Sequence, residues 1–276
     1  MSLENLKQNW DEFGKTDPLW AIMTNPGKSQ NRWEIEEFFA TGTGEVARVI
    51  KYIRSLTIFT PPLGWGRKGK TVLDFGCGVG RVTQAFVPYF QTVYGVDIAP
   101  SMIRLAKKYA KTRKKDIKYF VNTKNNLKLF PDKKFDFVYC NIVLQHMQPM
   151  FAKEYIKEFL RVIKPGGIAL FQMPAEYMNL PSDNFKKKIK HFILGFHPEA
   201  LNQLYGIRAK ILKKPLMEIH TAKRETVEKY LKSIGAKIID IKRDFSVGKE
   251  IKSYKYAITS QSTGNPGKLD ISPGSR

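Results

Sequence analysis

Between residues 70 and 175, short apolar runs alternate with longer segments in which apolar residues recur at helical spacing. Short apolar runs bounded by turn residues are typical of buried parallel strands, and the longer segments are typical of the helices that connect them. This pattern predicts a mainly parallel sheet with right-handed crossovers and helices on both faces. The predicted strands are 70–75, 92–96, 117–121, 135–141 and 168–173, and the predicted helices are 81–89, 100–111 and 150–163.

A helical extension is predicted before this alternation, in residues 1–60. Apolar residues at helical spacing begin near Leu6, and a second helical piece begins near Trp33. We expect Thr41-Gly42-Thr43-Gly44 to interrupt that piece, because glycine lowers helix stability, and the helix to resume over 46–56. The extension is therefore predicted as separate helices packed beside the α/β segment.

The alternation stops after the fifth predicted strand, where residues 174–222 predict a mostly helical insertion. In doubly wound sheets, ligands bind at the carboxyl ends of the strands, which is where such an insertion would lie. A helix over 224–234 and a hairpin of strands over 236–242 and 254–259 then bring the sheet to seven strands. The predicted organisation is a helical extension over 1–60, an α/β domain over 61–260 that contains the insertion, and a disordered tail over 261–276.

Glycine recurs at alternate positions where the first predicted strand meets its helix. Asp74 is followed by Gly76, Gly78 and Gly80, and the second predicted strand ends at Asp97. Glycine lets a ligand approach the backbone, and the first N–H groups of the next helix then face that ligand. A carboxylate at the end of the second strand is suited to a bidentate contact with ribose hydroxyls. The pattern predicts a nucleotide-cofactor site.

The Gly-x-Gly-x-Gly spacing, with an acid two positions before its first glycine, resembles motif I of the class I S-adenosylmethionine (SAM)-dependent methyltransferases. Tyr94-Gly95-Val96-Asp97-Ile98 resembles their second motif, and the resemblance extends over about residues 68–175. It is strongest to the small-molecule branch, the type 11 and type 12 methyltransferase domains. It implies a Rossmann-like sheet, SAM as cofactor, S-adenosyl-L-homocysteine (SAH) as product, and a metabolite, natural-product or envelope-sugar precursor as acceptor.

The resemblance also implies a set of cofactor-binding residues. Asp97 would hold the ribose, Ile98 and Met102 would flank the adenine, and Asn141 would border the methionine part. Thr123 stands where the family often has an acid for the adenine amino group, so Asn122 or a backbone group is the alternative there. The full set is Asp74, Gly76, Cys77, Gly78, Gly80, Asp97, Ile98, Met102, Asn122, Thr123 and Asn141.

Histidine is the natural candidate for a catalytic base. Methyl transfer from a sulfonium depends mainly on holding donor and acceptor in line, so a base is needed only if the acceptor must lose a proton. Of the four histidines, His146 follows the fourth strand together with Gln145, and this pair is predicted to orient or deprotonate the acceptor. His191, His197 and His220 lie in the insertion and are candidate substrate contacts, with ordinary surface or core positions as the alternative.

Two segments could cover the predicted site, namely the aromatic-rich extension and the insertion. Trp20 and Trp33 are the candidate lid residues of the extension, and core packing is the alternative for both. We expect the two segments to close over the cleft together and exclude water.

The formal net charge of +22 suggests a polyanion as a second class of partner. Such a field attracts polyanions such as RNA or an anionic membrane surface, although a lysine-rich solvated surface has the same composition. The two cysteines, Cys77 and Cys140, cannot form a disulfide framework or a thiolate zinc site. With no apolar run of membrane-spanning length and no secretory signal at the amino terminus, we expect a cytoplasmic protein with reduced thiols and no metal.

Three functions remain open on the sequence. A small-molecule methyltransferase is favoured. An RNA or protein methyltransferase would suit the charge, but Asn141-Ile142-Val143-Leu144 lacks the Asn/Asp-Pro-Pro-aromatic signature of many base-amine methyltransferases. A dinucleotide-binding oxidoreductase or a non-catalytic cofactor-binding module is the third, and the glycine spacing argues against the oxidoreductase.

Overall fold

The computed structural model describes residues 2–56, 70–178 and 215–260. Within them, one sheet has the strand order β3-β2-β1-β4-β5-β7-β6. All neighbouring strands are parallel except β7, which is antiparallel to both β5 and β6. The predicted Rossmann-like, mainly parallel sheet of seven strands is confirmed. The strands are β1 (Thr71–Phe75), β2 (Thr92–Asp97), β3 (Lys118–Val121), β4 (Phe135–Cys140), β5 (Ile163–Tyr177), β6 (Ala236–Asp244) and β7 (Ile251–Ser260).

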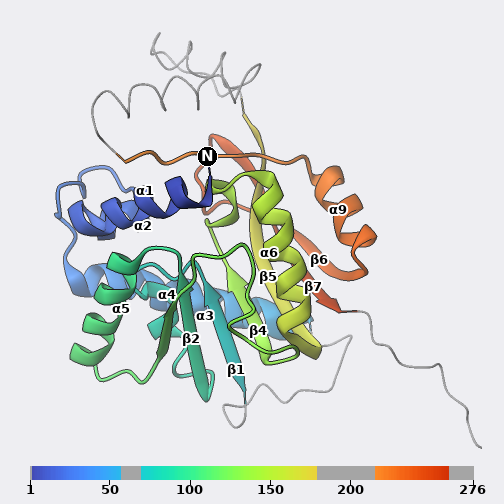
Figure 1. Ribbon diagram of the computed structural model, residues 1–276, viewed down its shortest axis with the longest axis horizontal. Helices are drawn as coiled ribbons and strands as arrows, with labels where there is room; N and C mark the ends of the chain where they lie inside the picture. Colours follow the sequence, from blue (N-terminus) through green and yellow to red (C-terminus); the bar gives the residue numbers. More distant parts are fainter. Residues whose placement is uncertain (1, 57–69, 179–214, 261–276) are drawn as a thin grey trace, which may run out of the picture.

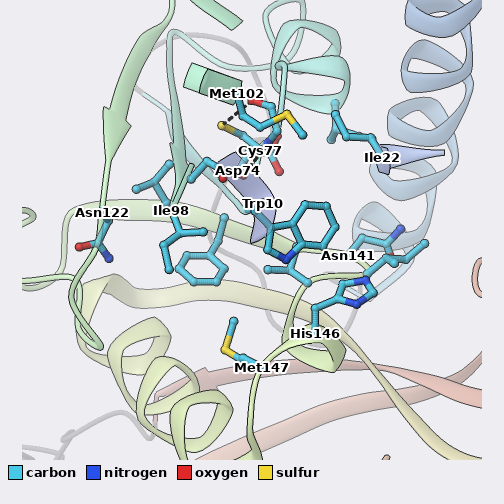
Figure 2. A pocket seen from close by; sticks show the side chains of 18 of the residues that line it. Trp10, Ile22, Asp74, Cys77, Ile98, Met102, Asn122, Asn141, His146 and Met147 are labelled. Atoms are coloured by element: carbon cyan, nitrogen blue, oxygen red, sulfur yellow. Dashed lines mark hydrogen bonds between the residues drawn. The ribbon is translucent and has the colours of Figure 1, made fainter. Parts of the chain in front are cut away.

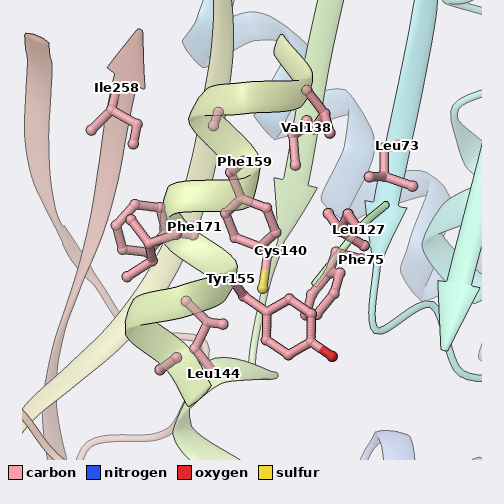
Figure 3. Close-up of a cluster of buried hydrophobic side chains, with 14 of the residues drawn as sticks. Leu73, Phe75, Leu127, Val138, Cys140, Leu144, Tyr155, Phe159, Phe171 and Ile258 are labelled. Atoms are coloured by element: carbon pink, nitrogen blue, oxygen red, sulfur yellow. The ribbon is translucent and has the colours of Figure 1, made fainter. Parts of the chain in front are cut away.

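Helices cover both faces of the sheet (Figure 1). On one face, α6 and α9 pack over a cluster that includes Phe75, Tyr155, Phe159 and Phe171 (Figure 3). On the other face, α3 and α4 cover a second cluster. The helices are α1 (Leu3–Thr16), α2 (Pro18–Ile22), α3 (Ile35–Leu56), α4 (Arg81–Ala85), α5 (Pro100–Thr112), the 3-10 turn η2 (Leu144–His146), α6 (Pro149–Val162) and α9 (Arg224–Ser233).

The order of the strands reverses beside β1. The chain runs from β1 outward through β2 to β3 and then returns to β4, which pairs with β1 on its other side. In open α/β sheets a ligand crevice forms outside the carboxyl ends of the strands at such a reversal. The glycine turn after β1 and the turn after β4 therefore border the expected crevice.

The predicted interruption of the helix in the extension is wrong, because α3 runs unbroken from Ile35 to Leu56. A Cβ atom on Gly42 would lie 2.3 Å from the carbonyl oxygen of Arg81, so the glycine lets α3 approach the start of α4 closely. Buried side chains at helical spacing, such as Phe38, Val46 and Val49, stabilise the helix through packing, which outweighs the low helix propensity of glycine.

Other element boundaries differ less. β5 is longer than predicted and runs to Tyr177, because its partner β7 begins at Ile251 and continues the antiparallel ladder. The helix after the glycine turn is regular only to Ala85. Residues 215–222 have no helix or strand. Residues 57–69, most of the insertion and the predicted disordered tail lie outside the described residues.

The helices α1 and α2 of the extension lie across the carboxyl ends of the strands, whereas α3 packs on a face of the sheet (Figure 1). Asp11 of α1 accepts a hydrogen bond from the Ser101 backbone N–H at 2.7 Å, at the beginning of α5, and its own carbonyl accepts one from the Ser101 hydroxyl at 2.8 Å. Asn9 accepts a hydrogen bond from the Leu216 backbone N–H at 3.1 Å. These contacts fasten α1 to α5 and to the segment that precedes α9. In the part of the chain that is described, no helix is both long and apolar enough to cross a bilayer.

Candidate active site

A cleft lies between the carboxyl ends of β1, β2 and β4 and the two helices α1 and α2. Figure 2 shows Asp74, Cys77, Met102, Asn141 and His146 gathered around it, with Trp10 over its centre. The predicted residues that line it are Asp74, Gly76, Cys77, Gly78, Asp97, Ile98, Met102, Asn122, Asn141 and His146.

The glycine turn is closely packed by neighbouring side chains. Gly76, Gly78 and Gly80 have φ angles of 73°, 53° and 86°, which side chains rarely allow. A Cβ atom on Gly78 would lie 2.5 Å from the Cδ1 atom of Ile22 in α2. One on Gly80 would lie 2.3 Å from the hydroxyl of Tyr119, and Gly80 does not line the cleft. A side chain at position 78 would thus displace α2 as well as any ligand.

Asp97 joins the glycine turn to the end of β2. One carboxylate oxygen accepts the Gly78 backbone N–H at 2.8 Å and the other accepts the Ala99 backbone N–H at 2.9 Å. Burial raises the pKa of Asp97 above its ordinary value, although these backbone hydrogen bonds oppose the shift. Each oxygen keeps a free lone pair, so the carboxylate can still accept hydrogen bonds from two ligand hydroxyls.

The structure supports neither of the two side-chain candidates for the adenine contact, Thr123 and Asn122, and leaves a backbone group as the third alternative. Thr123 is exposed and does not line the cleft. Asn122 lines it, but its side-chain amide donates to the carbonyls of Lys124 and Asn126 at 3.3 and 2.8 Å. Its amide oxygen accepts the Lys124 backbone N–H at 3.3 Å. The side chain of Asn122 is therefore used to shape the turn after β3.

Sequence reasoning missed a buried cluster around Glu45 of α3. The carboxylate of Glu45 accepts hydrogen bonds from the Tyr139 hydroxyl at 2.7 Å and the Asn141 amide at 3.0 Å, and it forms a 2.7 Å ion pair with Arg81. Burial alone would raise the pKa of Glu45, but the Arg81 charge and these hydrogen bonds hold it below its ordinary value. The sequence signal that could have revealed this cluster is an acidic residue on the otherwise apolar face of α3.

Asp74 lies beside this cluster at the end of β1. It is buried and accepts a hydrogen bond from the Thr83 hydroxyl at 2.6 Å. Burial raises the pKa of Asp74 to about 7, and the nearby charge of Glu45 adds to the shift. The carboxyl group of Asp74 therefore changes its charge near neutral pH.

The turn after β4 contains a residue in a rarely populated conformation. Ile142 has a φ of 58°, which is costly for a β-branched side chain. Its backbone N–H donates to the side-chain oxygen of Gln172 at 3.2 Å, and the buried Gln172 donates to Ser253 at 2.6 Å. The turn places Val143 against Gly76 and leaves Asn141 facing the cleft. Strain of this kind is often found at functional sites.

His146 is buried at the edge of the cleft, and its imidazole is neutral. Its Nδ1 atom lies 2.7 Å from the carbonyl oxygen of Glu218, which can only accept, so Nδ1 carries the proton. The Nε2 lone pair faces the amide nitrogen of Gln145 at 3.3 Å. Burial lowers the pKa of His146 to about 4. The centroids of the His146 and Trp10 rings lie 5.2 Å apart, edge to face.

Several predicted site residues lie away from the cleft. Gln145 is buried behind His146 and does not line it. His220 faces the carboxylate of Glu218 at 3.0 Å, and Trp33 is a core residue whose indole N–H donates to the Met23 carbonyl. Trp20 packs in the same core, so the alternative of core packing holds for both tryptophans. His191 and His197 lie outside the described residues. The residues of α1 and α2 that line the cleft are instead Leu3, Leu6, Trp10, Ala21 and Ile22.

Both cysteines are buried and unpaired. In the described ranges no group of three or more His, Cys, Asp or Glu side chains is arranged to hold a metal ion.

Comparison with known proteins agrees with the fold and the glycine turn. Residues 73–171 match the methyltransferase domain family. The ubiquinone biosynthesis O-methyltransferase of Coxiella burnetii is 35% identical over 104 residues, which are 38% of this chain and 43% of that protein. The phosphoethanolamine N-methyltransferase of Triticum aestivum is 27% identical over 175 residues, which are 58% of this chain and 34% of that protein. The chain spans less than half the length of these curated relatives.

A solved structure covers more of the chain. The magnesium protoporphyrin IX methyltransferase of Synechocystis PCC 6803, crystallised with bound SAH, superposes with a TM-score of 0.58 at 16% identity. The match covers 94% of this chain and 99% of that one. At this low sequence identity, it supports a shared fold and nothing more specific. The strand order, the glycine turn and the match over residues 73–171 identify a class I SAM-dependent methyltransferase domain in this part of the chain.

Proposed function

We propose that the protein transfers a methyl group from SAM to a small-molecule acceptor and releases SAH. The observation that carries the proposal is Asp97, whose buried carboxylate is fixed by the glycine turn and keeps lone pairs free toward the cleft. That arrangement suits the two hydroxyls of a ribose. The cofactor supplies an electrophilic methyl group on a sulfonium centre.

The cluster around Glu45 is suited to the amino-acid end of SAM. Arg81 is buried, and its Nε atom has no hydrogen-bond partner among the described residues, so it can donate to a carboxylate. Glu45 also lines the cleft and can accept hydrogen bonds from an ammonium group. The ion pair between Arg81 and Glu45 thus offers both signs of charge to a zwitterion.

His146 is proposed to orient the acceptor. Its neutral ring can accept a hydrogen bond at Nε2 once Gln145 gives up its contact, while the Glu218 carbonyl keeps the proton on Nδ1. A hydrogen bond of this kind would hold an acceptor hydroxyl or amine in line for attack. Trp10 and α1 would exclude water above it.

Calorimetric titration tests the proposal. We expect SAM and SAH to bind with one-to-one stoichiometry and NAD to give no heat of binding, because the adenosine end is recognised through Asp97 and the glycine spacing suits SAM. Production of SAH with a pool of metabolite acceptors then tests catalysis. Binding of NAD without SAM would contradict the proposal. Tight SAM binding with no transfer to any acceptor would identify a non-catalytic module.

The pH dependence of cofactor binding should distinguish SAM from SAH. A sulfonium beside Asp74 favours the ionised carboxylate, whose pKa is about 7 in the free protein. SAM affinity should therefore rise between about pH 6 and pH 8, with release of a proton on binding, whereas neutral SAH should respond much less. Calorimetry in two buffers of different ionisation enthalpy counts the protons. Asp74→Asn should abolish the difference, and equal slopes for SAM and SAH in the native protein would remove Asp74 from the sulfonium side.

A further inference from the structure

The cleft is acidic although the protein as a whole is strongly basic. Its charged lining groups in the described residues are Glu45, Asp74, Asp97 and Arg81. Arg81, the one cation of this set, is already paired with Glu45 at 2.7 Å. The charge of +22 is therefore carried elsewhere, and the described walls of the cleft offer no uncommitted lysine or arginine to an acceptor.

An anionic acceptor would be poorly accommodated by this lining. Moving a phosphate or carboxylate out of water is costly unless a cation or several hydrogen-bond donors replace the water. Arg81 and the single net positive charge of a bound SAM molecule together offset two of the three carboxylate charges, so one negative charge remains. Nearby carboxylates would repel a further anion, and more strongly in a closed cleft than in water.

Another part of the cleft lining is apolar. Leu3, Leu6 and Trp10 line it from α1, and we refer to these three residues as the α1 wall. Val143 and Met147 line it from the turn after β4. Leu3 and Trp10 are only partly buried, so part of each side chain remains available to a ligand. Such a wall gains free energy by covering the apolar surface of a ligand, about 25 cal/mol for each Å².

We infer that the methyl acceptor is an uncharged molecule whose apolar body packs on the α1 wall, and that acceptors with a phosphate, carboxylate or sulfonate next to the reacting group are excluded. The inference rests on the proposed function, since it assumes that SAM occupies the side of Asp97 and Glu45. His146 fits the same class of acceptor, because its ring brings no charge and can accept a hydrogen bond from a hydroxyl or amine.

A matched pair of fluorescent probes tests the inference. N-phenylnaphthylamine and anilinonaphthalene sulfonate share an aromatic framework and differ by one sulfonate. Each is titrated into the protein saturated with SAH, at about 0.15 M salt so that surface charges are screened. We expect the neutral probe to bind at least about 10-fold more tightly, and Trp10→Ala, also saturated with SAH, to weaken its binding by about 5-fold or more.

The control is Ile35→Ala, which removes an apolar side chain that is 44% exposed at the start of α3 and does not line the cleft. It should leave the affinity for the neutral probe unchanged. The inference would be overturned if the sulfonate probe bound more tightly than the neutral probe. It would also be overturned if Trp10→Ala left the affinity for the neutral probe unchanged. The comparison of the two probes on the native protein stands even if Trp10→Ala fails to fold. Absence of SAH and SAM binding would instead overturn the proposed function, so the two failures are distinct.

Discussion

Replacing Asp97 by asparagine is expected to weaken SAM binding by about 100-fold or more, equivalent to about 2.7 kcal/mol. Both carboxylate oxygens accept backbone N–H groups, at 2.8 and 2.9 Å, so an amide NH₂ would have to face one of these donors. The variant loses a charge-assisted acceptor for the ribose and also disturbs the turn at Gly78. Calorimetry with SAM measures the loss directly.

The matched control is Asp116→Asn, which makes the same chemical change at an exposed position between α5 and β3. It should leave SAM affinity within experimental error of the native value. Thermal unfolding of the Asp97 variant separates a binding defect from a folding defect, because the turn at Gly78 also contributes to stability. Native affinity for SAM in a folded Asp97→Asn protein would remove Asp97 from the cofactor site.

Replacing Gly42 by alanine is expected to lower the free energy of unfolding by about 2 kcal/mol or more. The new Cβ atom would lie 2.3 Å from the carbonyl oxygen and 2.9 Å from the carbonyl carbon of Arg81, and a backbone cannot yield as a flexible side chain can. Because α3 carries Glu45 and the contact involves Arg81, the displacement should also reduce SAM affinity.

Gly44→Ala provides the control on the same helix. A Cβ atom there would meet only the end of the Arg48 side chain, at an ordinary 3.5 Å. Alanine is the better helix former, so this variant should gain about 0.5 to 1 kcal/mol. Urea denaturation of the two variants and the native protein measures the difference. Equal effects at the two positions would show that the close approach of α3 to Arg81 does not matter for stability.

The sheet was predictable because buried parallel strands have a simple signature. Short apolar runs end at turn residues, and the glycine turn and Asp97 stand at fixed places relative to β1 and β2. Several residues predicted for the site, including Asp74, Asn141 and His146, therefore line one cleft next to these strands. Their placement together in one cleft follows from the strand order.

Residues that depend on contacts distant in the sequence were not predictable in this way. From the sequence, Gly42 is expected to break a helix. The structure shows that it instead allows the backbone of Arg81 to pack closely against α3. Glu45 lies 96 positions from Asn141, and its hydrogen bond to that residue follows only from the packing of α3 beside β4. Trp33 was a reasonable lid candidate, yet its indole N–H bonds within the extension. Composition cannot distinguish a core tryptophan from one that lines a cleft.

Under the proposed function, the docking of α1 has a consequence for the exchange of cofactor. Trp10 of α1 and Ile22 of α2 line the cleft, and Ile22 lies against the glycine turn. Wider opening of the cleft on this side would require α1 to separate from Ser101 and Leu216, which breaks a few hydrogen bonds and exposes buried side chains such as Leu6. If SAH leaves by this route, its release is coupled to the separation of α1, as in enzymes limited by product release.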